Sequence, residues 1–175
     1  HNDLMNLLDK HRLSGKYQFR LAGESVEGRT IHLLKYGNGI KKVFIWTQMH
    51  GDEPTATMAV CDLLNFFEKS DNFDKLRETI SKNLSIYILP LVNPDGAERF
   101  SRRNAMDIDI NRDAASLSTP EARILNSCAD SIKPDFGFNM HDQDPMYSVG
   151  MSQFQATLAF LAPAYNYEKE INPTR

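Results

Sequence analysis

The stretch Val43-Phe44-Ile45-Trp46-Thr47-Gln48-Met49-His50-Gly51-Asp52-Glu53 begins as an apolar run and ends in a histidine, a glycine and two acids. A run of β-branched and aromatic residues that stops at small and polar ones is typical of a parallel strand buried on both faces. His50 and Glu53 then lie three residues apart on the turn into the next helix, where an imidazole nitrogen and a carboxylate can face one zinc ion. An ordinary loop histidine followed by an acid in the first turn of a helix gives the same short pattern, so the rest of the chain has to separate the two interpretations.

Length and composition describe a globular protein of ordinary type. The chain has 175 residues, of which 41% are hydrophobic and 25% charged, and this length is sufficient for one domain with a full core. The net charge is −3 and the charges are interspersed. No basic patch therefore indicates nucleic acid, and no polybasic segment indicates a membrane surface. We expect a single domain over residues 1–175 that acts on small or polar substrates.

Neither the N-terminus nor the cysteines identify a compartment. No apolar stretch approaches the roughly 18 residues of a transmembrane helix, and the first residues lack the charged and apolar regions of a signal peptide. Because the chain begins at His1 rather than methionine, we expect further residues upstream, which leaves cytoplasmic, periplasmic and secreted locations open. Cys61 and Cys128 fall on the apolar stripes of two predicted helices, so we interpret them as buried free thiols.

Hydrophobic periodicity predicts strands that alternate with helices. Helices are expected over residues 3–13, 54–68 and 73–82 and from Thr119 onward, and strands over residues 17–21, 29–35, 84–92 and 135–140 besides the one that starts at Val43. The first two strands are expected to be antiparallel neighbours at a sheet edge, with His32 as a packed or rim residue rather than a ligand. The alternation predicts an α/β fold with a mixed, mostly parallel sheet and helices on both faces.

Three separate strands end in residues that can carry chemistry. His50 and Glu53 follow the strand at Val43, Asn93-Pro94-Asp95-Gly96 follows the next predicted buried strand, and His141-Asp142 follows the last one. In open α/β sheets, ligands bind outside the carboxyl ends of the strands. A catalytic zinc ion takes three protein ligands and leaves one position for water, so His50, Glu53 and His141 form a candidate ligand set.

Residues 99–113 concentrate arginines among acids and asparagines. Such a segment can be a solvated, ion-paired surface loop. However, Asp107, Asp109 and Asn111 alternate with apolar residues, so an extended segment would direct all three side chains to one side. Arginine is suited to binding a carboxylate through two parallel hydrogen bonds and to stabilising an oxyanion. The segment is therefore a candidate for substrate contacts.

Together these motifs resemble the zinc carboxypeptidase family typified by carboxypeptidase A. The match consists of His50-Gly51-Asp52-Glu53, Asn93-Pro94-Asp95-Gly96, Arg102 followed by Asp109-Ile110-Asn111-Arg112, and a strand that ends in His141. Four motifs in this order over residues 43–142 are far more specific than any one of them. The short loops between the motifs are similar to those of compact bacterial members. The resemblance implies a zinc carboxypeptidase-like fold, zinc as the cofactor, and peptides with a free C-terminal carboxylate as partners.

The resemblance also implies how the metal would be held. His50, Glu53 and His141 match the three zinc ligands of the family. Asp109 matches the acid that receives the other ring N–H of the first histidine ligand, which fixes the tautomer and orientation of that ring.

Three further positions match residues that contact the substrate in the family. Arg102 matches the arginine that polarises the scissile carbonyl and stabilises the tetrahedral oxyanion, and Arg103 is an adjacent alternative. Asn111 and Arg112 match the pair that binds the free C-terminal carboxylate.

The chain departs from the family pattern in three places. The family's general-base glutamate and its substrate-capping tyrosine lie far downstream of the third ligand, and nothing after His141 matches them, since Glu168 and Glu170 come too early and in a helix-like context. We therefore expect this chain to be part of a longer enzyme and to have little or no activity alone. Asp107 stands where the family usually has glycine. Asp142-Gln143 replaces the serine-tyrosine pair of the digestive enzymes.

Three functional hypotheses follow. The first is a zinc-dependent carboxypeptidase that releases a C-terminal residue from a peptide, for which a cell-wall peptide is one candidate. The second is a zinc-dependent deacylase of the aspartoacylase or succinylglutamate desuccinylase kind, which shares the histidine, glutamate and Asp-x-Asn-Arg motifs, although Asn93-Pro94-Asp95-Gly96 favours the peptidase. The third is a catalytically inactive module that binds zinc and recognises C-terminal carboxylates through Asn111 and Arg112. Substrate side-chain preference and oligomeric state stay open.

Overall fold

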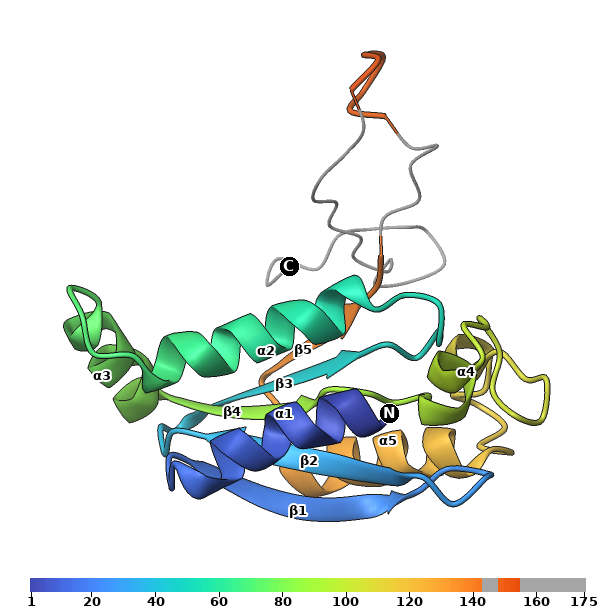
Figure 1. Cartoon of the computed structure of the whole chain (residues 1–175), viewed down its shortest axis with the longest axis horizontal. Coiled ribbons are helices and arrows are strands. Elements are labelled where there is room, and N and C mark those ends of the chain that lie inside the picture. The colour runs from blue at the N-terminus through green and yellow to red at the C-terminus, as the bar shows by residue number, and fades with distance from the viewer. Residues whose placement is uncertain (143–147, 155–175) are drawn as a thin grey trace. The chain divides into compact units, whose positions relative to one another are not determined.

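The computed structural model describes residues 1–142 and 148–154 of the chain. Residues 1–142 form one compact unit and residues 143–175 belong to a second. The elements, in chain order, are α1 (Asn2–Leu13), β1 (Tyr17–Glu24), β2 (Thr30–Tyr36), β3 (Lys41–Thr47), α2 (Thr55–Glu68), α3 (Asp74–Asn83), β4 (Leu84–Leu89), α4 (Pro94–Glu98), the 3₁₀ helix η1 (Ile110–Arg112), α5 (Pro120–Ile132) and β5 (Phe136–Met140) (Figure 1). Glu168 and Glu170 lie outside the described residues. The predictions of a single domain over residues 1–175 and of a longer parent enzyme stay predictions.

The described sheet has five strands in the order β1-β2-β4-β3-β5. β3 pairs in parallel with both β4 and β5, whereas β2 pairs antiparallel with both β1 and β4. Four of these strands therefore run in one direction, and β2 runs against them. The predicted α/β fold with a mixed sheet is confirmed, as are the antiparallel first pair and its place at an edge of the described sheet. Parallel pairing brings the carboxyl ends of β3, β4 and β5 to one end of the sheet, where α4 also lies (Figure 1).

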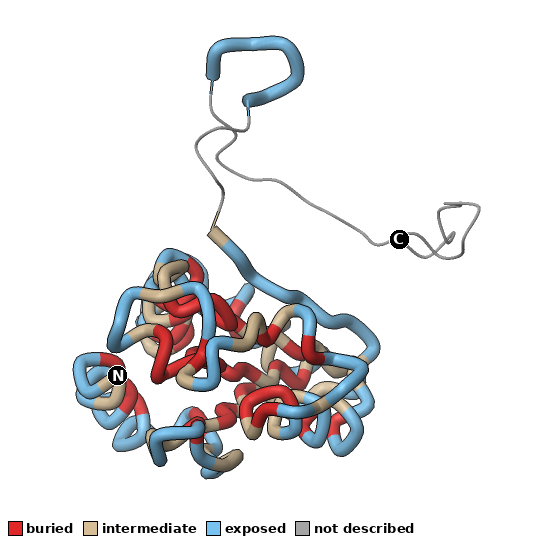
Figure 2. Tube along the Cα trace, turned by 90° about the vertical axis from the view of Figure 1, so that its right-hand side faces the viewer, coloured by how far each residue is buried: buried red, intermediate tan, exposed pale blue. Residues whose placement is uncertain are grey.

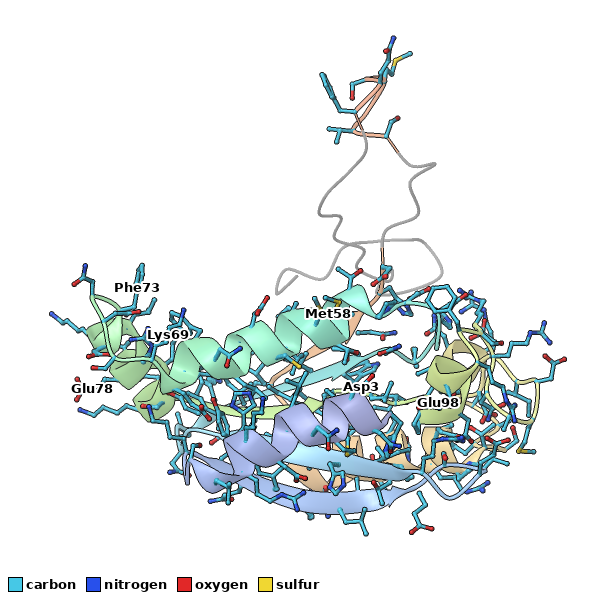
Figure 3. The ribbon with its side chains drawn as sticks, viewed as in Figure 1. Asp3, Met58, Lys69, Phe73, Glu78 and Glu98 are labelled. Atoms are coloured by element: carbon cyan, nitrogen blue, oxygen red, sulfur yellow. The ribbon has the colours of Figure 1, made fainter. Side chains whose placement is uncertain are left out.

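Helices cover both faces of the sheet, each over its own apolar cluster. On one face, α1 and α2 pack against β1, β2 and β4, and on the other face α5 packs against β2, β3 and β4. Buried residues are concentrated between these layers (Figure 2). The apolar residues at helical spacing that predicted α2 face the core, as Val60 and Leu64 do, whereas Met58 lies on another side of the helix and is 66% exposed (Figure 3). None of the described helices is both long and apolar enough to cross a bilayer.

The β4 strand is shorter than the predicted strand over residues 84–92. It ends at Leu89 because Pro90 follows, and proline has no N–H to continue a ladder. Backbone hydrogen bonds from Val92 to Thr47 and from Asn93 to Gln48, both 3.1 Å long, then hold the two chains side by side beyond the strands. The loop after β4 is therefore fixed next to the loop after β3.

β5 is the edge strand of the described sheet on the side of β3. Its apolar side chains Phe136, Phe138 and Met140 are 39–52% exposed, in contrast to the buried residues of β2 and β4. Cys61 and Cys128 are both free thiols; Cys128 is buried as predicted, whereas Cys61 is only half-buried.

Candidate metal centre

The turn after β3 places His50 in the interior. Gln48 adopts a left-handed backbone conformation with φ of 50°. Its side chain forms hydrogen bonds with Gly51 and with Thr57 of α2. The amide donates to the Gly51 carbonyl at 2.9 Å, and the amide oxygen accepts from the Thr57 hydroxyl of α2 at 2.7 Å. The first bond closes the turn and the second joins it to α2. His50, which lies within this turn, is only 2% exposed.

Residues 93–96 support this turn from the neighbouring loop. The Asn93 side chain accepts from the Gly96 amide at 2.9 Å, which caps α4, and donates to the Met49 carbonyl at 3.3 Å. Gly51 lies so close to α4 that an added Cβ atom would be 2.0 Å from the Gly96 carbonyl carbon. A Cβ atom on Gly96 would in turn be 2.7 Å from the Arg103 carbonyl oxygen, so packing requires glycine at both positions. The loop after β3 and the loop after β4 thus form one supporting unit.

The three predicted metal ligands converge at the ends of β3 and β5. One ligand atom from each of His50, Glu53 and His141 lies within 4.8 Å of the other two. The two oxygens of Glu53 bond the Nδ1 atoms of His50 and His141, each at 2.7 Å. Two imidazoles and one carboxylate that face a common point fit the donor set of a zinc ion with one position left for water. The group could hold a metal ion.

Asp109 lies behind His50, on the side away from the other two candidate ligands. Its Oδ1 atom is 3.1 Å from Nε2 of His50. A ring that donates its Nε2 hydrogen to a carboxylate keeps Nδ1 free to coordinate, which is the common way of fixing a ligand histidine. Burial by itself would raise the pKa of Asp109, but its hydrogen bond with His50 and the charge of Arg102 outweigh burial and lower that pKa. The carboxylate therefore stays ionised at neutral pH.

The pKa of Glu53 is set by a similar balance between burial and hydrogen bonds. Burial would raise the pKa of Glu53, but the hydrogen bonds with His141 and His50 are stronger in effect and hold that pKa below its usual value. Metal ions bind carboxylates in their deprotonated form, so an ionised Glu53 between His50 and His141 is in the state that can coordinate a cation.

Arg102, rather than Arg103, faces this group. Its guanidinium donates to Oδ2 of Asp109 at 3.1 and 3.2 Å, and Nη1 lies 3.1 Å from Nδ1 of His50. Arg103 turns away and bonds the backbone and side chain of Asp107. The geometry thus separates the two arginines that the sequence left as alternatives.

The segment that carries these residues is not extended, and the prediction that Asp107, Asp109 and Asn111 point to one side is wrong. Asn104 folds it into a tight turn, because its side-chain oxygen accepts from the amides of Met106 and Ile108 at 3.0 and 3.1 Å. Asp107 adopts φ of 58° in this turn, at the position where the family usually has glycine. Its side chain consequently points to Arg103, whereas Asp109 points to His50.

Asn111 and Arg112 lie on η1, the short helix that begins at Ile110 and is capped by Asp109. The Asn111 amide donates to Oδ1 of Asp109 at 2.9 Å, and the Asn111 side chain accepts from Asn139 of β5 at 3.3 Å. Arg112 is exposed and its Nη1 bonds the Asn111 carbonyl. Asn111 is thus joined to the group around His50, while the Arg112 guanidinium is bonded to none of the candidate ligands.

Several supporting residues were not recognised from the sequence. Glu121, in the first turn of α5, is fully buried and accepts from Asn104 at 3.1 Å and from the Val26 amide at 3.2 Å. Asp95 is equally buried and accepts from Ser25 at 2.7 Å. A single acid after a capping residue and proline gives no local sign of such partners, since they come from other parts of the chain.

Asp113 anchors the loop from η1 to α5, and its removal is expected to destabilise the protein. Its carboxylate accepts from the amides and hydroxyls of Ser118 and Thr119 at 2.5–3.0 Å. We expect Asp113→Ala to lower the free energy of unfolding by about 3 kcal/mol at pH 7, because the buried donors of Thr119 and the part-buried donors of Ser118 lose a charged acceptor. Asp130→Ala, an exposed carboxylate of α5, is the matched control.

The effect of Asp113 should depend on pH. Burial would raise the pKa of Asp113, but the four hydrogen bonds overcome it and lower the pKa to about 2, against 3.8 for the free side chain. The contribution is therefore complete above pH 3.8 and is lost as the pH falls toward 2. Urea unfolding of wild type and Asp113→Ala between pH 7 and pH 3 measures the difference. A gap that is absent at pH 7, or constant over this range, would contradict the assignment.

Comparison with known proteins identifies the family. The model of the zinc carboxypeptidase family matches residues 10–165. The chain belongs to the zinc carboxypeptidase family. The resemblance inferred from the sequence motifs is thereby confirmed.

Individual relatives agree with this membership. Carboxypeptidase SOL1 of Arabidopsis thaliana is 37% identical over 65 residues, which cover 37% of this chain and 13% of that protein. An uncharacterised protein of Zymomonas mobilis is 25% identical over 162 residues, or 89% of this chain and 40% of its own length. The metallo-carboxypeptidase from Burkholderia cenocepacia superposes with a TM-score of 0.72 at 25% identity, covering 78% of this chain and 39% of that one. This zinc carboxypeptidase chain thus spans less than half the length of these relatives.

Proposed function

We propose that this chain supplies the metal centre and carboxylate-binding residues of a zinc-dependent carboxypeptidase, which hydrolyses the C-terminal peptide bond of a peptide. The proposal rests on the convergence of His50, Glu53 and His141, with Asp109 behind the first histidine and Arg102 beside it. Hydrolytic zinc sites use this type of donor set and keep one position open. Family membership supports the same assignment.

Each of these residues has a distinct task in the proposed reaction. Zinc, when bound, supplies a Lewis acid that polarises the scissile carbonyl and brings the pKa of water toward neutrality. Asp109 holds the His50 ring so that Nδ1 faces the other ligands. Arg102 lies beside the same nitrogen, where its N–H groups can donate to the oxygen that becomes negatively charged in the tetrahedral state.

The general base is not assigned within residues 1–142 and 148–154. Two carboxylates, the candidate ligand Glu53 and Asp109, are hydrogen-bonded to His50. A carboxylate that orients or ligates the metal is poorly placed to accept a proton from water and deliver it to the leaving amine. The expectation of little turnover by residues 1–175, which was drawn from the sequence, stays a prediction.

Asn111 and Arg112 are proposed to bind the substrate's terminal carboxylate. We expect Arg112→Gln to weaken binding of a peptide with a free C-terminus by roughly tenfold to a hundredfold, because a hydrogen bond between charged groups is worth about 1.5–3 kcal/mol. Isothermal titration of the zinc-loaded chain with one peptide, as the free acid and as the C-terminal amide, measures this directly. The amide should bind equally weakly to wild type and to Arg112→Gln.

Arg123→Gln is the control for that experiment, since Arg123 bonds the carbonyls of Leu117 and Ser118 near the start of α5. It removes the same charge without touching η1. A loss of affinity that is as large for Arg123→Gln, or as large for the amidated peptide, would mean that Arg112 does not contact the carboxylate.

The reaction type is tested with paired substrates. A carboxypeptidase should shorten a peptide with a free C-terminus by one residue and leave its C-terminal amide intact, whereas a deacylase should cleave an N-acylated amino acid instead. Mass spectrometry of both reactions, with the chain and with its longer native form if one exists, separates these two functions. Peptide binding without cleavage by either form would support the inactive, carboxylate-binding module.

A further inference from the structure

We propose that Asp142 is a positioning residue that clamps the end of β5 onto the start of α2 and so fixes His141 relative to Glu53. This inference rests on the proposed metal centre for its functional meaning. Asp142 belongs to the pair Asp142-Gln143 that departs from the serine-tyrosine pair of the digestive enzymes, so its task is not given by the family pattern.

The contact itself is a helix cap supplied from another strand. Oδ1 of Asp142 accepts from the Thr55 amide at 3.1 Å, and Oδ2 accepts from the Thr55 hydroxyl at 2.8 Å. Thr55 is the first residue of α2, and its amide is one of the groups that lack a partner within the helix. The residue before it, Pro54, makes no side-chain cap, and the first turn of α2 contains no acid. Asp142 therefore supplies a negative charge to a helix start whose own first turn contains none.

The place of this contact determines what it controls. His141 directly precedes Asp142, and Glu53 lies two residues before Thr55. The registered pairing of β5 with β3 ends at Met140, so His141 and Asp142 lie beyond the sheet ladder. The Asp142 amide also donates to Oε2 of Glu53, at 3.3 Å. Beyond the strands, the side-chain clamp thus adds bonds to α2 to the two that His141 and the Asp142 amide make with Glu53.

Zinc affinity of a small set of variants tests this role. We expect Asp142→Ala to raise the zinc dissociation constant roughly tenfold, the lower end of what removal of a supporting group costs. Thr55→Val should give a smaller increase and Thr55→Ser almost none, since serine keeps the hydroxyl. The double variant Thr55→Val/Asp142→Ala should be no worse than Asp142→Ala alone. Competition with a chromophoric chelator at pH 7 measures all four without requiring turnover.

Two comparisons separate positioning from general destabilisation. Asp135→Ala removes an acid at the opposite end of β5, where it bonds Lys41 and the Lys42 amide, and should leave zinc affinity unchanged. In a His141→Ala background, Asp142→Ala should cause no further loss, because the residue through which it acts is gone. An unchanged zinc dissociation constant for Asp142→Ala, or a full additional loss in the His141→Ala background, would overturn the proposal.

Hydrogen exchange in metal-free protein tests the clamp independently of zinc. The Thr55 amide should be protected in wild type and should lose that protection in Asp142→Ala. If wild type binds no zinc, the metal-centre proposal fails and the role of Asp142 in zinc affinity fails with it, while the exchange measurement still decides whether the clamp exists. A Thr55 amide that stays protected in Asp142→Ala would overturn the clamp itself.

Discussion

His141→Ala is expected to abolish tight zinc binding, whereas the wild-type chain should hold about one zinc ion. Structural zinc sites bind with roughly 10–16 kcal/mol, so one of four ligands is worth about 3–4 kcal/mol, or a several-hundredfold change in affinity. So large an effect is expected because His141 is one of the three candidate ligands. Its Nδ1 atom lies 2.7 Å from Glu53, and ligand atoms of His50, Glu53 and His141 all lie within 4.8 Å of one another. Metal analysis after dialysis and a chelator competition assay measure the loss.

His32→Ala is the matched control, because it removes an imidazole from β2 that the structure keeps apart from the candidate ligands. It should retain full zinc occupancy. His50→Ala should behave like His141→Ala, although it also removes a buried ring that is bonded to Asp109. Absence of zinc from freshly purified wild type at neutral pH, or retention of tight binding by His141→Ala, would refute the ligand assignment.

The sequence was most informative where local pattern and long-range order agree. Apolar residues at helical spacing located α2, and the apolar run before His50 located β3. The rule that ligands gather at the carboxyl ends of parallel strands then brought His141 next to Glu53 across 88 positions of sequence, as observed. Strand ends are predictable because the direction of each strand in the sheet leaves little freedom for the residue that follows it.

The shape of residues 102–112 was not predictable in the same way. Alternation of Asp107, Asp109 and Asn111 indicated an extended segment, but the side chain of Asn104 bonds two backbone amides of its own loop and folds it into a turn. Asn104 is in turn bonded to Glu121, 17 residues away. Side-chain to backbone bonds of this kind compete with regular structure and have no periodic signature, so a single sequence does not reveal them.

Arg102→Gln is expected to weaken binding of a transition-state analogue by roughly a hundredfold to a thousandfold, the typical cost of losing one donor to an oxyanion. A peptide phosphonate, whose tetrahedral anion resembles the state formed by attack on the carbonyl, is the probe. A planar peptide of the same sequence should lose less than about threefold, since the proposed bond forms only when charge develops on the oxygen. Both affinities can be measured with the zinc-loaded chain, so the result does not depend on turnover.

Arg103→Gln distinguishes a specific donor from the general charge of this segment. Arg103 is adjacent in sequence and carries the same charge, but it bonds Asp107 rather than Asp109 and His50. It should change neither affinity appreciably. The zinc dissociation constant of Arg102→Gln must be measured alongside, because loss of its two bonds to Asp109 could loosen the support of His50. An equal loss for the planar and tetrahedral ligands, or a larger loss for Arg103→Gln, would show that Arg102 does not stabilise the developing charge.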